Sequence, residues 1–126
     1  MTPGAVIFTH DKERLTRFYQ ALTGWEMTTR DDVIAVLASD HAELVLHAIP
    51  AQHDADPPTE SPAPAREDSY LKLFFPVDSL ARARERAAAH GGRLQPAERE
   101  WVGRGFRASE GVDPDGNVIQ CREAMP

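Results

Sequence analysis

Ionisable side chains alternate with apolar ones in three short segments whose composition is typical of β-strands. Because side chains along a strand point alternately to opposite faces, residues two or four apart share one face. The residues with this spacing that could bind or transform a ligand are Glu43, His47, Lys72, Phe74, Gln120 and Arg122. We expect them to line a solvated cavity, with the intervening apolar residues forming a hydrophobic layer beneath it.

Glu43 and His47 are the best candidates for catalysis. A carboxylate and an imidazole are the side chains that most often move protons near neutral pH. Both lie in the segment Glu43–His47, where the even spacing places them on one strand face. The alternative for His47 is a hydrogen-bonded strand histidine without a chemical role.

Lys72 has two interpretations, as a functional amine or as a structural charge. It could form a Schiff base or bind a substrate carboxylate, or it could serve as the partner of an acidic residue. A lysine and a glutamate inside a cavity carry a large desolvation cost unless they are paired. We therefore predict an ion pair between Lys72 and Glu43.

The segment Glu100–Arg107 combines a tryptophan, a phenylalanine and two arginines with two glycines. This composition predicts a flexible arm or a hairpin. Trp101 could stack on a planar ligand, and Arg107 could hydrogen-bond an anion through both of its terminal nitrogens. The alternative is a dimer contact or the ordinary packing of a hairpin.

The elements that must position these residues occur twice in the chain. Asp11 is the expected N-cap of a helix-patterned stretch that ends at Gly24. Asp78 is the expected N-cap of another that ends at Gly91, 67 residues later at both landmarks. A strand pattern precedes each helix, and three short strand patterns follow it. The repeat predicts an α+β fold of two βαβββ modules, at residues 3–49 and 70–125, within one domain spanning 1–126.

Residues 50–69 interrupt the repeat. Prolines at positions 50, 57, 58, 62 and 64 stand among acidic and small residues, with no apolar period. We expect an extended linker or surface loop. A segment of this length could alternatively lie over a cleft as a lid.

Composition and charge exclude some classes of function. The formal net charge of −6 argues against a sequence-independent nucleic-acid-binding protein, which needs a basic surface. No apolar run approaches the roughly 20 residues of a membrane span, and the N-terminus lacks the features of a signal peptide, so we expect a cytoplasmic protein. The single cysteine, Cys121, lies in a strand pattern and is expected to be a small buried hydrophobic residue.

Two motifs resemble the vicinal oxygen chelate superfamily, which includes glyoxalase I, bleomycin-resistance proteins, fosfomycin-resistance enzymes and extradiol dioxygenases. The first motif begins at Phe8-Thr-His-Asp11 and ends at Gly24-Trp25; the second is the turn Asp113-Pro-Asp-Gly-Asn117 and the strand up to Gln120. The resemblance implies that each module is a curved sheet with its helix on the convex side. The two modules would then form a curved mixed sheet around a cup-shaped cavity that holds the ligand.

The resemblance also implies where a metal would bind. Metal-dependent members place ligands on the first and last strands of each module, and the corresponding positions here are Gly4 (or Ala5), Glu43, Lys72 and Gln120. Only Glu43 is an ordinary metal ligand, because glycine and alanine have no ligand atom, lysine is a cation and an amide is a weak donor. We therefore expect a cup without a metal or other cofactor.

The resemblance implies a protein of the bleomycin-resistance type, which binds a small organic molecule without chemistry, commonly as a homodimer. The residues expected to contact the ligand are Lys72, Phe74, Trp101, Arg107, Gln120 and Arg122. The alternative is a metal-dependent lyase, isomerase or dioxygenase-like enzyme that uses Glu43 and His47. A third interpretation is an interaction module whose cup has no ligand.

Overall fold

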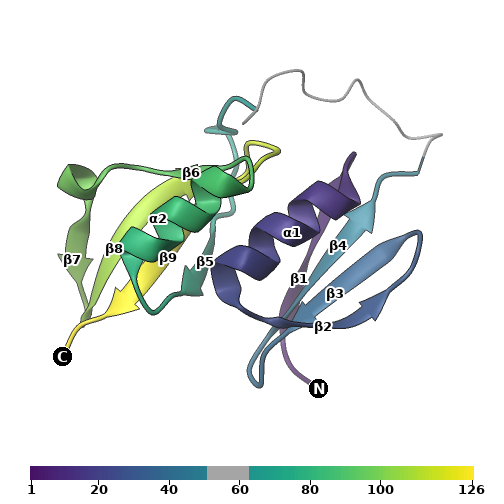
Figure 1. The fold of residues 1–126 in the computed structure, drawn as a ribbon, viewed down its shortest axis with the longest axis horizontal. Coiled ribbons are helices and arrows are strands. Elements are labelled where there is room, and N and C mark those ends of the chain that lie inside the picture. Colours follow the sequence, from purple (N-terminus) through teal and green to yellow (C-terminus); the bar gives the residue numbers. More distant parts are fainter. Residues whose placement is uncertain (51–62) are drawn as a thin grey trace.

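The chain forms two modules, each with one helix packed against a mixed β-sheet (Figure 1). The computed structural model describes residues 1–50 and 63–126. The first module contains β1 (Gly4–Thr9), α1 (Lys12–Thr23), β2 (Glu26–Arg30), β3 (Ile34–Ala38) and β4 (Glu43–Ala48). The second contains β5 (Leu73–Pro76), α2 (Leu80–Ala89), β6 (Arg93–Leu94), a 3₁₀ turn (Ala97–Arg99), β7 (Trp101–Gly103), β8 (Phe106–Val112) and β9 (Val118–Ala124).

The strands form two separate sheets with related topologies. The first sheet has the order β1-β4-β3-β2, and the second has the order β5-β9-β8-β6, with β7 paired to β8. In each sheet the first strand of the module runs parallel to the last one, β1 beside β4 and β5 beside β9. The predicted α+β fold of duplicated modules is confirmed, and the second module gains β7 because residues 101–112 form a hairpin.

Helix α1 begins and ends as its sequence predicts. The Asp11 carboxylate accepts a hydrogen bond from the Arg14 amide, which satisfies one of the free N–H groups of the first turn. Gly24 follows the helix with a φ of 70°, a left-handed conformation that glycine adopts without steric cost. Between these ends, the apolar stripe of the helix is buried against the sheet.

Helix α2 begins one residue later than predicted. Its N-cap is Ser79, whose hydroxyl accepts a hydrogen bond from the Arg82 amide at 3.2 Å, so the predicted Asp78 cap is wrong. Asp and Ser cap helices about equally well, and the sequence offers both at adjacent positions. Among the described residues, neither helix is long and apolar enough to cross a membrane.

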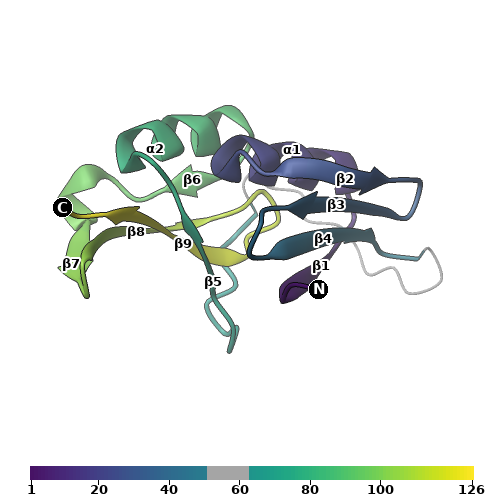
Figure 2. The same ribbon diagram turned by 90° about the horizontal axis from the view of Figure 1, so that it is seen from below.

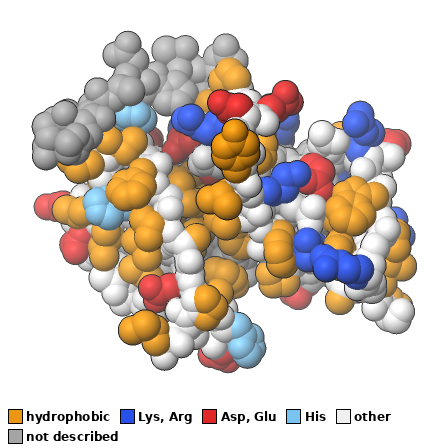
Figure 3. All heavy atoms as spheres, turned by 180° about the vertical axis from the view of Figure 1, so that it is seen from behind, with side chains coloured by type: hydrophobic (Ala, Val, Ile, Leu, Met, Phe, Trp, Pro, Cys, Tyr) orange, Lys and Arg blue, Asp and Glu red, His pale blue; other side chains and the backbone are white. Residues whose placement is uncertain are grey.

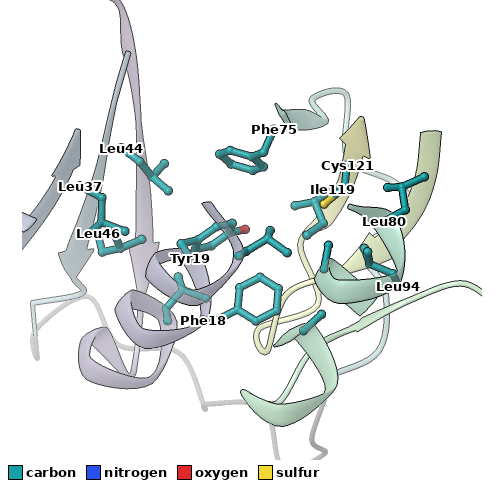
Figure 4. Packing of buried hydrophobic residues seen from close by; sticks show 14 residues of the cluster. Phe18, Tyr19, Leu37, Leu44, Leu46, Phe75, Leu80, Leu94, Ile119 and Cys121 are labelled. Carbon is teal, nitrogen blue, oxygen red and sulfur yellow. The ribbon is translucent and has the colours of Figure 1, made fainter. Parts of the chain in front are cut away.

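The hydrophobic core lies between the two modules as well as within them (Figure 4). The ring of Tyr19 on α1 lies 5.4 Å from the ring of Phe75 on β5, and Trp25 approaches the same phenylalanine at 5.8 Å. Burying an aromatic side chain contributes about 1.5–3 kcal/mol. The shared aromatic cluster therefore fixes the first module against the second.

The turn between β8 and β9 adds a buried polar contact to this boundary. Asp113 accepts a hydrogen bond from the Tyr19 hydroxyl at 2.6 Å, and Asp115 accepts one from the Thr9 hydroxyl at 2.6 Å and another from Arg14 at 3.1 Å. The predicted turn is confirmed, and both of its carboxylates bind side chains of the other module. Burial raises the pKa of Asp113, because the donors around the carboxylate only partly offset its desolvation.

Part of the predicted surface linker is fixed to this turn. Ala63 is buried, its amide donates to the Pro114 carbonyl at 3.1 Å, and the Arg66 amide donates to the Gly116 carbonyl at 2.8 Å. The surface-loop prediction is therefore wrong for Ala63, whereas Pro64 and Arg66 are exposed as predicted. Residues 51–62, and with them most of the alternative lid, lie outside the described residues.

Cys121 is a buried strand residue, as predicted, on the core face of β9. Desolvation, with a smaller contribution from the charge of Glu110, raises the pKa of its thiol to about 12. A thiol with this pKa is a poor nucleophile at neutral pH.

Candidate functional site

The second sheet has a face that points away from the core, which we call the open face. It carries Phe74, Phe106, Glu110, Gln120 and Arg122. Both helices lie on one side of the molecule (Figure 2), and the opposite side shows hydrophobic side chains over both modules, with Lys and Arg side chains mostly over the second (Figure 3). The polar contacts of this region converge on the open face.

Glu110 is the centre of these contacts. Its carboxylate accepts hydrogen bonds from Lys72 Nζ at 2.7 Å, Trp101 Nε1 at 3.0 Å and Gln120 Nε2 at 2.9 Å. The β8–β9 register places Glu110 directly opposite Gln120, and the β7–β8 hairpin brings Trp101 over the same face. Three separate segments thus supply donors to one carboxylate. We call these four residues the Glu110 cluster.

The cluster keeps Glu110 ionised. Partial burial would raise the pKa of the carboxyl, but the hydrogen bonds from Lys72, Trp101 and Gln120 outweigh this effect and lower it. The Glu110 side chain retains 28% of its exposure and the Lys72 side chain 46%. At neutral pH the positive charge of Lys72 is therefore balanced locally.

Arg122 extends the polar network along β9. Its Nε donates to Gln120 Oε1 at 2.6 Å. The guanidinium carbon lies 3.5 Å from the centre of the Phe74 ring and 4.3 Å from that of Phe106, within the range of cation–π attraction. Arg122 is therefore held by a hydrogen bond and two aromatic rings.

The structure brings together five of the residues predicted to contact a ligand, namely Lys72, Phe74, Trp101, Gln120 and Arg122. It does not bring Arg107 to them. Arg107 alternates with Phe106 along β8 and therefore points to the opposite face, where its nearest terminal nitrogen lies 4.0 Å from Glu100.

The predicted ion pair between Lys72 and Glu43 is wrong. Lys72 precedes β5 of the second sheet and pairs with Glu110, whereas Glu43 is an exposed residue of β4 in the first sheet. Sequence reasoning missed Glu110. Its alternation with Phe106 and Ala108 indicates which face it shares, but its donors come from segments whose register a single sequence does not reveal.

Glu43 and His47 lie on β4 of the first sheet, and within the described residues neither forms a hydrogen bond or an ion pair with the Glu110 cluster. Glu43 does line a cavity of about 190 Å³ together with Phe74. His47 Nδ1 is 2.7 Å from the Ala48 carbonyl, so the neutral ring carries its proton there and leaves Nε2 as an acceptor. The ring also contacts Phe8, with centroids 4.9 Å apart. The Cα atoms of Glu43 and His47 are four residue steps apart along β4, which is roughly 13 Å.

The positions at which the sequence resemblance implies metal ligands do not fit a divalent ion here. A Cβ added at Gly4 would lie 2.5 Å from the Glu43 carbonyl oxygen and 2.9 Å from Glu43 Cγ, so the backbone leaves no room for a ligand side chain. Lys72 and Gln120 both donate to Glu110. In the described part of the chain, no three His, Cys, Asp or Glu residues form a group that could hold a metal ion.

Two cavities share part of their lining, and the larger of the two borders the cluster. One, of about 460 Å³, is lined by Lys72 and Glu110 together with the segment before β5 and parts of β6, β8 and β9. The other, of about 260 Å³, lies between β1 and the second sheet. Ser69, Leu71, Val118 and Ile119 line both. The larger cavity is within the size range of small-molecule sites.

Comparison with solved structures shows the same fold in several bacterial proteins. A glyoxalase/bleomycin resistance protein from Albidiferax ferrireducens T118 superimposes with a TM-score of 0.69 at 21% identity, covering 98% of each chain. A glyoxalase/bleomycin resistance protein/dioxygenase family enzyme from Burkholderia phytofirmans PsJN gives 0.68 at 18% identity, covering 97% of each chain. A fosfomycin resistance protein from Mesorhizobium loti gives 0.65 at 15% identity, covering 99% of this chain and 92% of that protein.

Sequence comparison gives the family. No curated protein matches the chain at a significant level. The family model described as a glyoxalase-like domain matches residues 4–121, which is nearly the whole chain. The chain therefore belongs to the glyoxalase-like domain family, within the vicinal oxygen chelate superfamily.

Proposed function

We propose that this protein binds a small organic molecule beside the Glu110 cluster, and that it does so without a divalent metal. The observation that carries the proposal is the pairing of Lys72 with Glu110 at the wall of the cavity of about 460 Å³. A ligand in this cavity would contact the Lys72–Glu110 pair and apolar side chains such as Leu71, Val118 and Ile119. This mixture of apolar walls and a few placed polar groups is typical of small-molecule sites.

The charges of the cluster support the metal-free part of the proposal. A metal ion near Lys72 and Gln120 would have to displace an ammonium group from a carboxylate at 2.7 Å. It would gain one carboxylate ligand, Glu110, and remain close to a positive charge. Divalent cations in proteins need several anionic or imidazole ligands, and this arrangement does not supply them.

The competing function is a metal-dependent lyase, isomerase or dioxygenase-like enzyme that uses Glu43 and His47. It would require those side chains to converge on one reacting atom, yet their Cα atoms are roughly 13 Å apart along β4. The His47 ring is instead engaged with the Ala48 carbonyl and the Phe8 ring. Without a metal to acidify a substrate, an exposed carboxylate such as Glu43 is also a weak base. We therefore favour binding over catalysis.

A ligand screen tests the proposal. Thermal unfolding would be recorded against a panel of apolar and aromatic compounds for the wild-type protein, for Trp101→Ala and for the control variant Val102→Ala. Val102 is the exposed neighbour of Trp101 on β7. We expect compounds that raise the melting temperature of the wild type and of Val102→Ala but act more weakly on Trp101→Ala. A flat response across the panel would instead support an interaction module without a ligand.

The expected homodimer and the cytoplasmic location remain predictions. Sedimentation equilibrium of the purified protein measures the oligomeric state directly. A mass near 28 kDa, about twice the 13.9 kDa of one chain, would support the dimer. The mass of a single chain at every protein concentration would refute it.

A further inference from the structure

Arg122 is positioned as a fixed cation rather than as a mobile surface arginine. The Phe74 and Phe106 rings lie within 3.5 Å and 4.3 Å of its guanidinium carbon. The Nε–H group is bound to Gln120 Oε1, and Gln120 is itself held by Glu110. The two rings and the hydrogen bond together restrict the Arg122 side chain. Little further conformational entropy would therefore be lost when its two terminal nitrogens bind a ligand.

The charge of Arg122 is not balanced by a carboxylate. Within the described residues, Arg14, Arg30 and Arg84 each form a salt bridge with an acidic side chain, whereas none is formed by Arg122. Lys72 is already neutralised by Glu110. Arg104 also lies near the Phe106 ring, at 5.5 Å from its centre, and adds a second positive charge. The open face therefore has an excess of positive charge on a protein whose net charge is −6.

The surroundings of Arg122 are aromatic and accessible. Phe74 retains 55% of its exposure and Trp101 retains 42%, although large aromatic side chains are usually well buried. Aromatic faces stack on planar ligands, and a guanidinium with two free terminal nitrogens binds a carboxylate through two parallel hydrogen bonds. These two kinds of group lie side by side on the open face.

We infer that the ligand is an aromatic carboxylate, with its carboxylate on the terminal nitrogens of Arg122 and its ring system against the exposed aromatic side chains. This inference rests on the proposed function and gives it a ligand class. It places the ligand over the open face beside the Glu110 cluster, because Arg122, Phe74 and Trp101 do not line the cavity of about 460 Å³. The Glu110 cluster then has a positioning role, because Gln120 joins the Glu110 carboxylate to Arg122 and sets the direction of the guanidinium.

Matched pairs of ligands test the inference. Isothermal titration calorimetry would measure binding of benzoate, 1-naphthoate and 9-anthracenecarboxylate and of their neutral amides. We expect at least one acid to bind about tenfold or more tightly than its amide, because the amide lacks the charge-assisted hydrogen bonds. The advantage of the acid should disappear in Arg122→Gln and persist in Arg86→Gln, which removes an exposed arginine of α2. Arg122→Lys, which keeps the charge but not the paired donors, should retain part of the advantage.

The possible failures separate the two proposals. If acids and amides bind equally and Arg122→Gln changes neither, the anion site is refuted while small-molecule binding stands. If no acid or amide binds the wild-type protein, the proposed function and this inference both fail for aromatic ligands. Circular dichroism of each variant shows whether a loss of binding reflects unfolding. Within one folded variant, the ratio of acid affinity to amide affinity then reports on the anion site alone.

Discussion

Replacing Tyr19 with phenylalanine should destabilise the protein by removing one hydrogen bond between the modules. Tyr19 and Asp113 are both fully buried, and their side chains are joined at 2.6 Å. The substitution deletes only the hydroxyl, so the ring packing against Phe75 is kept. Asp113 would retain donors from the Asp115 amide and from the backbone and side chain of Asn117.

The size of the loss follows from the charge and burial of the acceptor. A hydrogen bond to a charged group contributes about 1.5–3 kcal/mol, and the remaining donors limit the penalty of leaving the carboxylate underbonded. We therefore expect Tyr19→Phe to lower the free energy of unfolding by about 2 kcal/mol. The matched control is Tyr70→Phe, since Tyr70 is fully exposed; there the change should stay within about 0.5 kcal/mol.

Urea unfolding at two pH values checks both the magnitude and its origin. Because the folded-state pKa of Asp113 is raised, its contribution favours the folded state at acidic pH and is lost as pH rises above the ordinary aspartate pKa. Loss of the Tyr19 donor raises that pKa further, so the destabilisation should be larger at pH 7 than near pH 4. Equal stabilities of Tyr19→Phe and Tyr70→Phe, or a loss independent of pH, would refute this reasoning.

Three further substitutions test other parts of the account. Glu110→Gln should cost about 1 kcal/mol or less, because the pair with Lys72 is partly exposed. Because the pKa of Glu110 is lowered in the folded protein, its carboxylate stabilises the fold above the ordinary glutamate pKa, and this stabilisation is lost as pH falls through the lowered pKa. The melting temperature of Glu110→Gln should therefore fall less on acidification than that of Glu85→Gln. Gly116→Ala should lower the free energy of unfolding by well over 1 kcal/mol, since the φ of Gly116 is 85° and the new Cβ would collide with the Pro64 carbonyl. The control Gly105→Ala, with a φ of 84° and open space around the new Cβ, should cost only about 1 kcal/mol. Equal losses in chemical denaturation would contradict the close contact at Gly116. Ser79→Ala should lower stability by about 1 kcal/mol while Asp78→Ala has little effect, and the reverse order would restore Asp78 as the cap of α2.

The duplicated modules were accessible from sequence because their signals are local. The Asp11 cap, the Gly24 stop and the alternation of polar and apolar residues in β4 and β9 each depend on only a few neighbouring residues. The cap of α2 was misplaced by one residue because Asp78 and Ser79 are both good capping residues, and only the backbone conformation distinguishes them.

The partner of Lys72 was not accessible from the sequence. Strand alternation correctly places Lys72, Gln120 and Arg122 on strand faces that point away from the hydrophobic layer. It does not say which sheet a residue belongs to or which strands are adjacent. The prediction therefore joined Lys72 to a glutamate of the other module. The pairing of β8 with β9 instead brings Glu110 beside Gln120, and this register depends on contacts throughout the sheet.

The hairpin at Trp101–Val112 was also predictable in its existence but not in the direction of its side chains. Its glycines and aromatic residues predicted a hairpin, and β7 and β8 form one around Arg104 and Gly105, which both have positive φ. The alternation of side chains along β8 decides whether Arg107 belongs to the site. Phe106 and Glu110 point to the open face, and Arg107 points to the opposite face. One residue of register therefore decides whether an arginine belongs to the site.

Metal binding by the wild-type protein tests the central claim most directly. Protein purified without chelators would be analysed for metal content and then titrated with Zn²⁺, Ni²⁺ and Mn²⁺ by calorimetry, with Glu43→Gln as the comparison. We expect no ion bound at one per chain in either protein, because an ammonium group paired to Glu110 occupies the position of a ligand. One tightly bound ion per chain in the wild type that is lost in Glu43→Gln would contradict the account and favour the metal-dependent enzyme.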